Sequence, residues 1–140
     1  MAMLQPWRIA LSTVLISAGL ASPAFASPKI VQSTNLPASI SNGTTVGATQ
    51  GNRQWRCDGY IPAQPDMILR VTNQANLQLV VRGSSDLRLQ VDGPINFCLN
   101  HSSGNALVQP GLFVPGEYRL YVGSHQGVSQ PFNLSVQPGN

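Results

Sequence analysis

Charged and aromatic side chains are scarce in this sequence, and cysteine is almost absent. Of the 140 residues, 9% are charged, 6% are aromatic and two are cysteine. A helical bundle or a coiled coil needs far more Lys and Glu, so both fold classes are excluded. The formal net charge is only +3 and no basic run occurs, so nucleic acid is not an expected partner.

An apolar segment near the start predicts export. Ile9–Leu20 is apolar and follows Arg8, and Ala24-Phe25-Ala26 supplies small residues at the two positions that a signal peptidase reads. The segment is shorter than the roughly 20 residues that cross a bilayer, and no second run of spanning length follows. We therefore interpret residues 1–26 as a cleaved Sec-type signal peptide. The mature protein is expected to be periplasmic or extracellular, with no membrane span.

Export determines how the two cysteines are interpreted. In an oxidising compartment a single pair of cysteines indicates one disulfide, here Cys57–Cys98. The chain-entropy model assigns a loop of this length about 4 kcal/mol of stabilisation. The alternative is a reactive or metal-bound thiol pair, which lacks both a C-x-x-C motif and a neighbouring His/Cys cluster.

Most of the mature chain alternates between apolar and polar residues with a period of two. Turn residues such as Asp-Gly-Pro and Pro-Gly separate the alternating runs, and no stretch of ten residues has the apolar spacing of an amphipathic helix. Such runs are typical of antiparallel strands with one buried face. The sequence therefore predicts an all-β, antiparallel sandwich or jelly roll, with strands over residues 67–72, 77–82, 87–92, 117–122 and 132–137.

The segment Ser27–Gly51 differs from the rest of the mature chain. It is rich in Ser, Thr, Asn, Gly and Pro, and no apolar periodicity lasts. We expect a flexible leader over residues 27–51, with one short strand near Thr44–Val46, followed by a β-sandwich domain over residues 52–140.

One hairpin is predicted in more detail. If Gly83-Ser84-Ser85 forms a turn, Arg82 lies opposite Asp86 on the neighbouring strand. This cross-strand ion pair would stabilise the strand register by about 0.2–1 kcal/mol.

Several short motifs together resemble a known family, the bacterial pre-peptidase C-terminal domain, and in particular a small secreted cyanobacterial variety of it. The resemblance covers about Cys57 to Val136. Its motifs are Cys57-Asp58-Gly59-Tyr60-Ile61-Pro62, Ser84-Ser85-Asp86-Leu87, Gly93-Pro94, Phe97-Cys98, Pro115-Gly116-Glu117-Tyr118 and Leu120-Tyr121-Val122-Gly123.

The resemblance implies a jelly-roll-like sandwich that is usually appended to secreted hydrolases. Members of this family are non-catalytic, and some of them bind calcium or a polymeric substrate, so the resemblance implies the same possibilities for this chain. Similar cyanobacterial sequences place acidic residues after Phe-Cys, whereas this chain continues with Leu99-Asn100-His101. Calcium needs six to eight oxygen ligands, and the weak candidates here are Asp92 and Asn100. No other metal site and no cofactor is predicted.

The residues do not suggest an enzyme. A nucleophile must lie within hydrogen-bond reach of a base, and the bases available are His101 and His125, each next to a serine. The chain has no G-x-S-x-G, H-E-x-x-H or phosphate-binding loop motif. Both histidines are interpreted as exposed loop residues.

A surface is the remaining candidate for function. By the alternation, four arginines and one tyrosine face outward, together with Gln78, and such a face could hold an acidic polysaccharide or a protein through arginine hydrogen bonds. The alternative is a solvated sheet face without a ligand. Trp55 is a second exposed-aromatic candidate unless it packs on the disulfide. The predicted binding residues are Arg70, Arg82, Arg88, Arg119 and Tyr121.

These features predict an exported, non-catalytic β-sandwich module that binds, or has a structural role, at the cell envelope or outside the cell. An envelope polysaccharide or a secreted protein is the expected partner. The alternative is a calcium-stabilised structural or accessory domain related to those of secreted peptidases.

Overall fold

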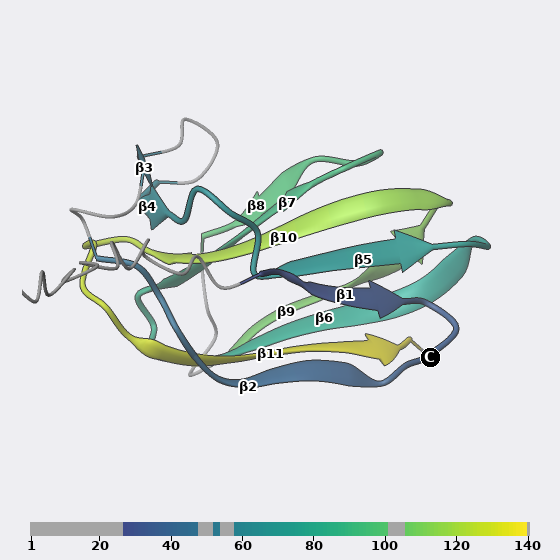
Figure 1. Cartoon of the computed structure of the whole chain (residues 1–140), viewed down its shortest axis with the longest axis horizontal. Coiled ribbons are helices and arrows are strands. Elements are labelled where there is room, and N and C mark those ends of the chain that lie inside the picture. The colour runs from purple at the N-terminus through teal and green to yellow at the C-terminus, as the bar shows by residue number, and fades with distance from the viewer. Residues whose placement is uncertain (1–26, 48–51, 54–57, 101–105, 140) are drawn as a thin grey trace, which may run out of the picture.

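The computed structural model describes residues 27–47, 52–53, 58–100 and 106–139, and this part of the chain is built from strands without any helix (Figure 1). Consequently, no helix there is long and apolar enough to cross a membrane. The strands are β1 (Lys29–Gln32), β2 (Ala38–Thr44), β3 (Asn52–Arg53), β4 (Tyr60–Ile61), β5 (Met67–Val71), β6 (Ala75–Gly83), β7 (Leu87–Asp92), β8 (Phe97–Leu99), β9 (Ala106–Phe113), β10 (Gly116–Ser124) and β11 (Pro131–Pro138).

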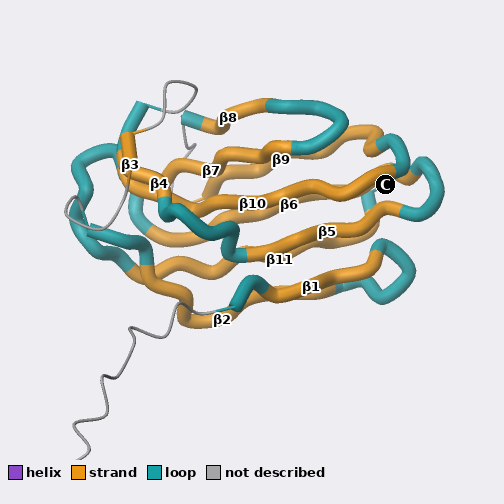
Figure 2. Tube along the Cα trace, turned by 45° about the horizontal axis from the view of Figure 1, so that its top comes forward, coloured by secondary structure: helices purple, strands orange, loops and turns teal. Residues whose placement is uncertain are grey.

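The strands form two sheets that pack face to face. The seven-stranded sheet has the order β1-β5-β10-β4-β3, and β7 pairs with β10 and with β8. The four-stranded sheet has the order β2-β11-β6-β9. Figure 2 shows both sheets of the sandwich. Strand β1 of one sheet lies against β2 of the other along one side, and β7 lies against β9 toward the opposite side. The predicted all-β sandwich is confirmed.

The core lies between the sheets and follows the predicted alternation. Strands β5, β7 and β10 bury every second residue against the inward residues of β6 and β11, so one face of each strand is apolar. Tyr118 is fully buried, and its hydroxyl donates to the Val114 carbonyl at 2.8 Å, which satisfies the one polar atom of the ring. The ring of Phe113 meets it edge to face at 5.1 Å between centroids.

The prediction of a flexible leader is wrong for residues 29–44. Strand β1 pairs with β5, in parallel rather than antiparallel, and β2 pairs with β11 in the other sheet. The single short strand expected near Thr44–Val46 is instead β2, which ends at Thr44. Both strands lie at sheet edges. In β1 only Val31 is buried, so the sequence of this strand lacks the apolar–polar alternation of a central strand.

The predicted hairpin between β6 and β7 is also wrong. Strand β6 belongs to the four-stranded sheet and β7 to the seven-stranded sheet, so Arg82 and Asp86 are not a cross-strand pair. Both strands carry inward leucines, and these leucines enter the same core from the two opposite sheets. Gly83 permits the crossing, because its φ of +153° is one that side chains rarely adopt.

Candidate binding surface

Four of the five predicted binding residues lie on one face of the molecule. Arg70 of β5, Arg88 of β7, and Arg119 and Tyr121 of β10 project from the outer side of the seven-stranded sheet, because their neighbours in each strand are buried in the core. Arg82 lies on β6 of the four-stranded sheet, on the opposite side of the sandwich. Gln78 lies on the same strand as Arg82. The predicted cluster is therefore split between two faces.

Two arginines share one carboxylate on this outer face. Strands β5 and β10 place Arg70 directly opposite Glu117. Arg70 Nε lies 3.4 Å from Glu117 Oε2, and Arg119 Nε lies 3.8 Å from Glu117 Oε1. All three side chains are between 42% and 58% exposed. Two positive charges therefore flank one negative charge at a solvated surface, where each ion pair contributes little to stability.

Tyr121 extends this surface toward β7. Burial raises the pKa of the Tyr121 hydroxyl, the nearby charge of Asp92 raises it further, and Arg119 opposes that effect. The cross-strand register sets Arg119 opposite Asp92 and Tyr121 opposite Gln90. Asp92 thus adds a second acid among the arginines, so the face carries mixed charge rather than a uniform positive charge.

Arg88 takes a different role from the other two arginines of this face. It is half-buried, its Nη1 donates to the Leu87 carbonyl at 3.0 Å, and its Nε is buried without a hydrogen-bond partner. Gln90, two residues along the same face, has a buried Oε1 that is likewise unpaired. Because the guanidinium of Arg88 is turned into the protein, we leave Arg88 out of the candidate surface. The surface then consists of Arg70 and Arg119, which are exposed, and Tyr121, which is half-buried.

The weak calcium candidates do not come together. Strands β7 and β8 pair Leu89 with Leu99 and Val91 with Phe97, so Asp92 lies at the turn end of this hairpin and Asn100 at its open end. No group of three or more His, Cys, Asp or Glu side chains in the described ranges is arranged to hold a metal ion.

The predicted disulfide falls partly outside the described residues. Cys98 lies on β8, and Asn100 Oδ1 is 3.0 Å from its sulfur. No cysteine that the structure describes is a free thiol. Cys57 lies outside the described residues, as do Trp55 and His101, so the Cys57–Cys98 bridge stays a prediction.

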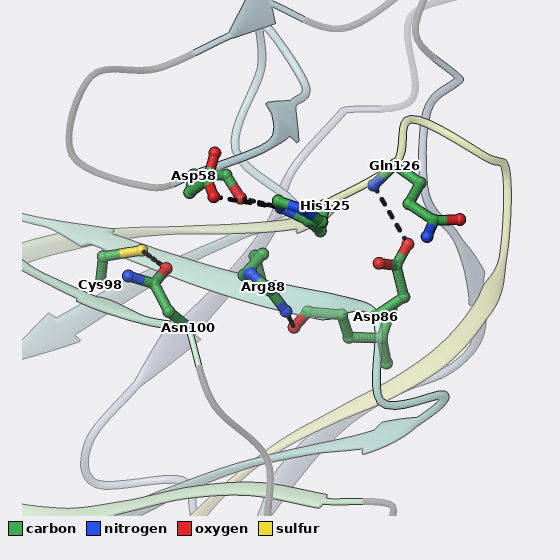
Figure 3. A network of polar contacts seen from close by, with 8 residues as sticks. Asp58, Asp86, Arg88, Cys98, Asn100, His125 and Gln126 are labelled. Carbon is green, nitrogen blue, oxygen red and sulfur yellow. Dashed lines mark hydrogen bonds and ion pairs between the residues drawn. The ribbon is translucent and has the colours of Figure 1, made fainter.

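His125 lies beside an acid but not beside a nucleophile. Its Nδ1 is 3.4 Å from Asp58 Oδ2 and 3.1 Å from the Asp58 carbonyl (Figure 3). Ser124, the adjacent serine, is fully buried on the core side of β10. The Ser124 Oγ is buried without a hydrogen-bond partner among the described residues, so His125 does not hydrogen-bond to it.

The comparison with known proteins supports the fold. No model of a known protein family matches the chain. An uncharacterized protein of Synechococcus elongatus is 29% identical over 116 residues, which cover 79% of this chain and 81% of that protein. Among solved structures, the pre-peptidase C-terminal domain of a collagenase from Bacillus anthracis matches with a TM-score of 0.57. The match covers 79% of this chain and 95% of that domain. The chain has the fold of a pre-peptidase C-terminal domain.

This similarity is one of architecture. Sequence identity to the Bacillus anthracis domain is 15%, so no residue role is carried from that pre-peptidase C-terminal domain to this chain. A periplasmic inhibitor of g-type lysozyme from Aeromonas hydrophila aligns with a TM-score of 0.40 at 15% identity, over 79% of this chain and 96% of that one.

Proposed function

We propose that this protein is an exported, non-catalytic binding module whose outer sheet face binds an acidic polysaccharide of the cell envelope or its surroundings. Export is supported by the apolar segment Ile9–Leu20 and the small residues of Ala24-Phe25-Ala26. The binding surface is the one formed by Arg70, Arg119 and Tyr121, and we call it the arginine face.

The observation that carries this proposal is the pair of exposed arginines held around Glu117. A guanidinium has five N–H donors in a planar fork, and each of these arginines approaches Glu117 through its Nε. The fork matches carboxylate and sulfate groups, which are the charged groups of acidic polysaccharides. Tyr121 adds a ring beside the arginines on which a sugar can stack.

The calcium-stabilised alternative has less support. A calcium site needs several oxygen atoms to converge, and the strand register separates Asp92 from Asn100.

The test compares one arginine from each face of the sandwich. Arg119→Ala and Arg82→Ala each remove one exposed positive charge, but from opposite sheets. Binding is measured by retention on immobilised alginate and dextran sulfate, with neutral dextran as the uncharged control. We expect Arg119→Ala to weaken binding about fivefold, which corresponds to about 1 kcal/mol, and Arg82→Ala to change it by less than about twofold.

Added salt should weaken retention, because charges at an exposed surface are screened. Equal losses for the two variants, or equal retention on neutral dextran, would contradict the proposal. Absence of binding to every polysaccharide would instead point to a protein partner.

A further inference from the structure

The loop between β10 and β11 forms many hydrogen bonds with other segments, although much of it is exposed. Residues His125–Gln130 connect β10 to β11, and they lie next to the segment that follows β2 and the segment that precedes β7. Gln126, Val128 and Ser129 are exposed, whereas Gly127 is buried and has a φ of +71° that favours glycine.

On one side the loop is bonded to Thr45, which is 3% exposed. The Thr45 amide donates to the Gln130 carbonyl at 2.8 Å, and the Gln130 amide donates to Thr45 Oγ1 at 2.9 Å. Thr45 Oγ1 donates to the Val128 carbonyl at 3.3 Å, and Ser129 Oγ donates to the Thr45 carbonyl at 2.9 Å. A single threonine thus bonds to Val128 and to the two residues that follow it.

On the other side the loop is bonded to Asp86. The His125 amide donates to the Asp86 carbonyl at 2.9 Å. The Gln126 amide donates to Asp86 Oδ2 at 3.3 Å (Figure 3). Gln130 Nε2 donates to Asp86 Oδ2 at 2.7 Å, and Ser84 Oγ bonds Gln130 Oε1. Two separate segments of chain therefore hold this short loop in one conformation.

The loop presents an apolar side chain at its tip. Val128 is 56% exposed, the highest fraction among the large apolar residues of the described chain. A β-branched side chain has few rotamers to lose, and a backbone already fixed in place loses little entropy on binding. A single exposed valine on a mobile loop is ordinary. Here the hydrogen bonds fix the loop before any partner binds, and loops fixed on a scaffold often carry binding residues.

We propose that residues Gln126–Ser129 form a preformed recognition loop that inserts Val128 into an apolar pocket of a folded protein partner. The charged groups of the polar network around the loop are Asp58, Asp86 and Arg88 (Figure 3). Arg88 is half-buried and bonds the Leu87 carbonyl, so the acidic groups favour a protein over a lipid surface, because they would repel anionic headgroups. The same charges fit a pocket whose rim carries N–H donors or cationic side chains. This surface is distinct from the arginine face, so it is an additional binding site.

The first experiment places a photo-crosslinking amino acid at Val128 in the full chain expressed in its native host. Val108, which is 45% exposed on β9, is the matched control position. We expect a protein adduct from position 128, identified by mass spectrometry, and none of the same partner from position 108. Equal adducts from both positions, no protein adduct, or adducts to lipid or glycan alone would overturn the proposal.

The second experiment measures affinity for the purified partner. We expect Val128→Asp to weaken the Kd at least tenfold and Val108→Asp to change it by less than twofold, with both variants keeping the wild-type melting temperature. Asp86→Ala should weaken binding and increase hydrogen exchange of the Gln126 amide, because it removes the carboxylate that accepts from this amide. An unchanged Kd for Val128→Asp would refute the inference.

The two proposals fail independently. Arg119→Ala should leave the adduct at position 128 unchanged, because Arg119 lies on the outer face of the seven-stranded sheet rather than on this loop. If Arg119→Ala abolished that adduct, the loop would not be a separate site and this inference would be wrong.

Discussion

At the scale of single residues, Asp66 shows how one side chain completes a sheet. Val122 lies in the part of β10 between Leu120, which pairs with β5, and Ser124, which pairs with β4. Neither strand supplies an acceptor for the Val122 amide, which instead donates to Asp66 Oδ2 at 2.7 Å. This position removes water from the Asp66 carboxylate, which disfavours its charged form. Burial therefore raises the pKa of Asp66 from 3.8 to about 6.

The raised pKa of Asp66 gives stability a pH dependence with a defined sign. The folded state binds this proton more tightly than the unfolded state, so the contribution of Asp66 to the free energy of unfolding falls as pH rises from about 4 to about 6. Above that range the loss is at most about 3 kcal/mol. We expect Asp66→Asn, whose amide oxygen can still accept from Val122, to be more stable than wild type at pH 8 and equally stable at pH 4. Urea unfolding at several pH values measures the difference, and a difference independent of pH would contradict this account.

At the scale of elements, the sheet edges explain why the amino-terminal strands were hard to predict and how the sandwich avoids pairing with other chains. Strands β1 and β8 have four and three residues, and β9 carries Pro110, which has no amide hydrogen for a further strand. Strand β2 is irregular, because its register with β11 shifts and Asn42 has a φ of +58°. Short, bulged or proline-bearing edges do not template a new strand.

The role of β1 is tested by two neighbouring substitutions. Val31 is 4% exposed and packs in the core, whereas Ile30 is 53% exposed on the same strand. We expect Val31→Ala to lower the free energy of unfolding by about 1–3 kcal/mol. Ile30→Ala should change it by less than about 0.5 kcal/mol. Urea unfolding of the two variants gives the comparison, and equally small effects would mean that β1 does not stabilise the sandwich.

At the scale of the whole molecule, the two layers separate the candidate surfaces. The arginine face lies on the outer side of the seven-stranded sheet, and the recognition loop joins β10 of that sheet to β11 of the other. The two proposed binding sites therefore lie on different parts of one sandwich.

The whole-molecule prediction concerns calcium. We expect the melting temperature to be the same in EDTA and in millimolar calcium, because the strand register keeps Asp92 and Asn100 apart. A bound ion at a hundredfold excess over its Kd would add about 2.7 kcal/mol. In a domain of this size such a gain raises the midpoint by several degrees. A rise specific to calcium would contradict the prediction, and Asp92→Asn would then show whether Asp92 is a ligand.

The sequence by itself determined which residues face the core. The alternation in the runs around Leu69, Leu89 and Leu120 is local, since the side chains of a strand point to its two faces in turn, and it was sufficient to predict an all-β sandwich. It also placed Arg70, Arg119 and Tyr121 on outer faces.

Only the tertiary structure decided which strands are neighbours. Pairing depends on contacts between residues far apart in the chain, and both the apolar pattern and the Gly83-Ser84-Ser85 link are compatible with a hairpin or with a crossing between sheets. The crossing between β6 and β7 places Arg82 on the far face. The pairing of β5 with β10 places Glu117 beside Arg70 and Arg119. The segments after β2 and before β7 bring Thr45 and Asp86 to the loop that carries Val128. Hydrophobic burial determines the faces of strands one at a time, whereas a binding surface is formed by several strands together.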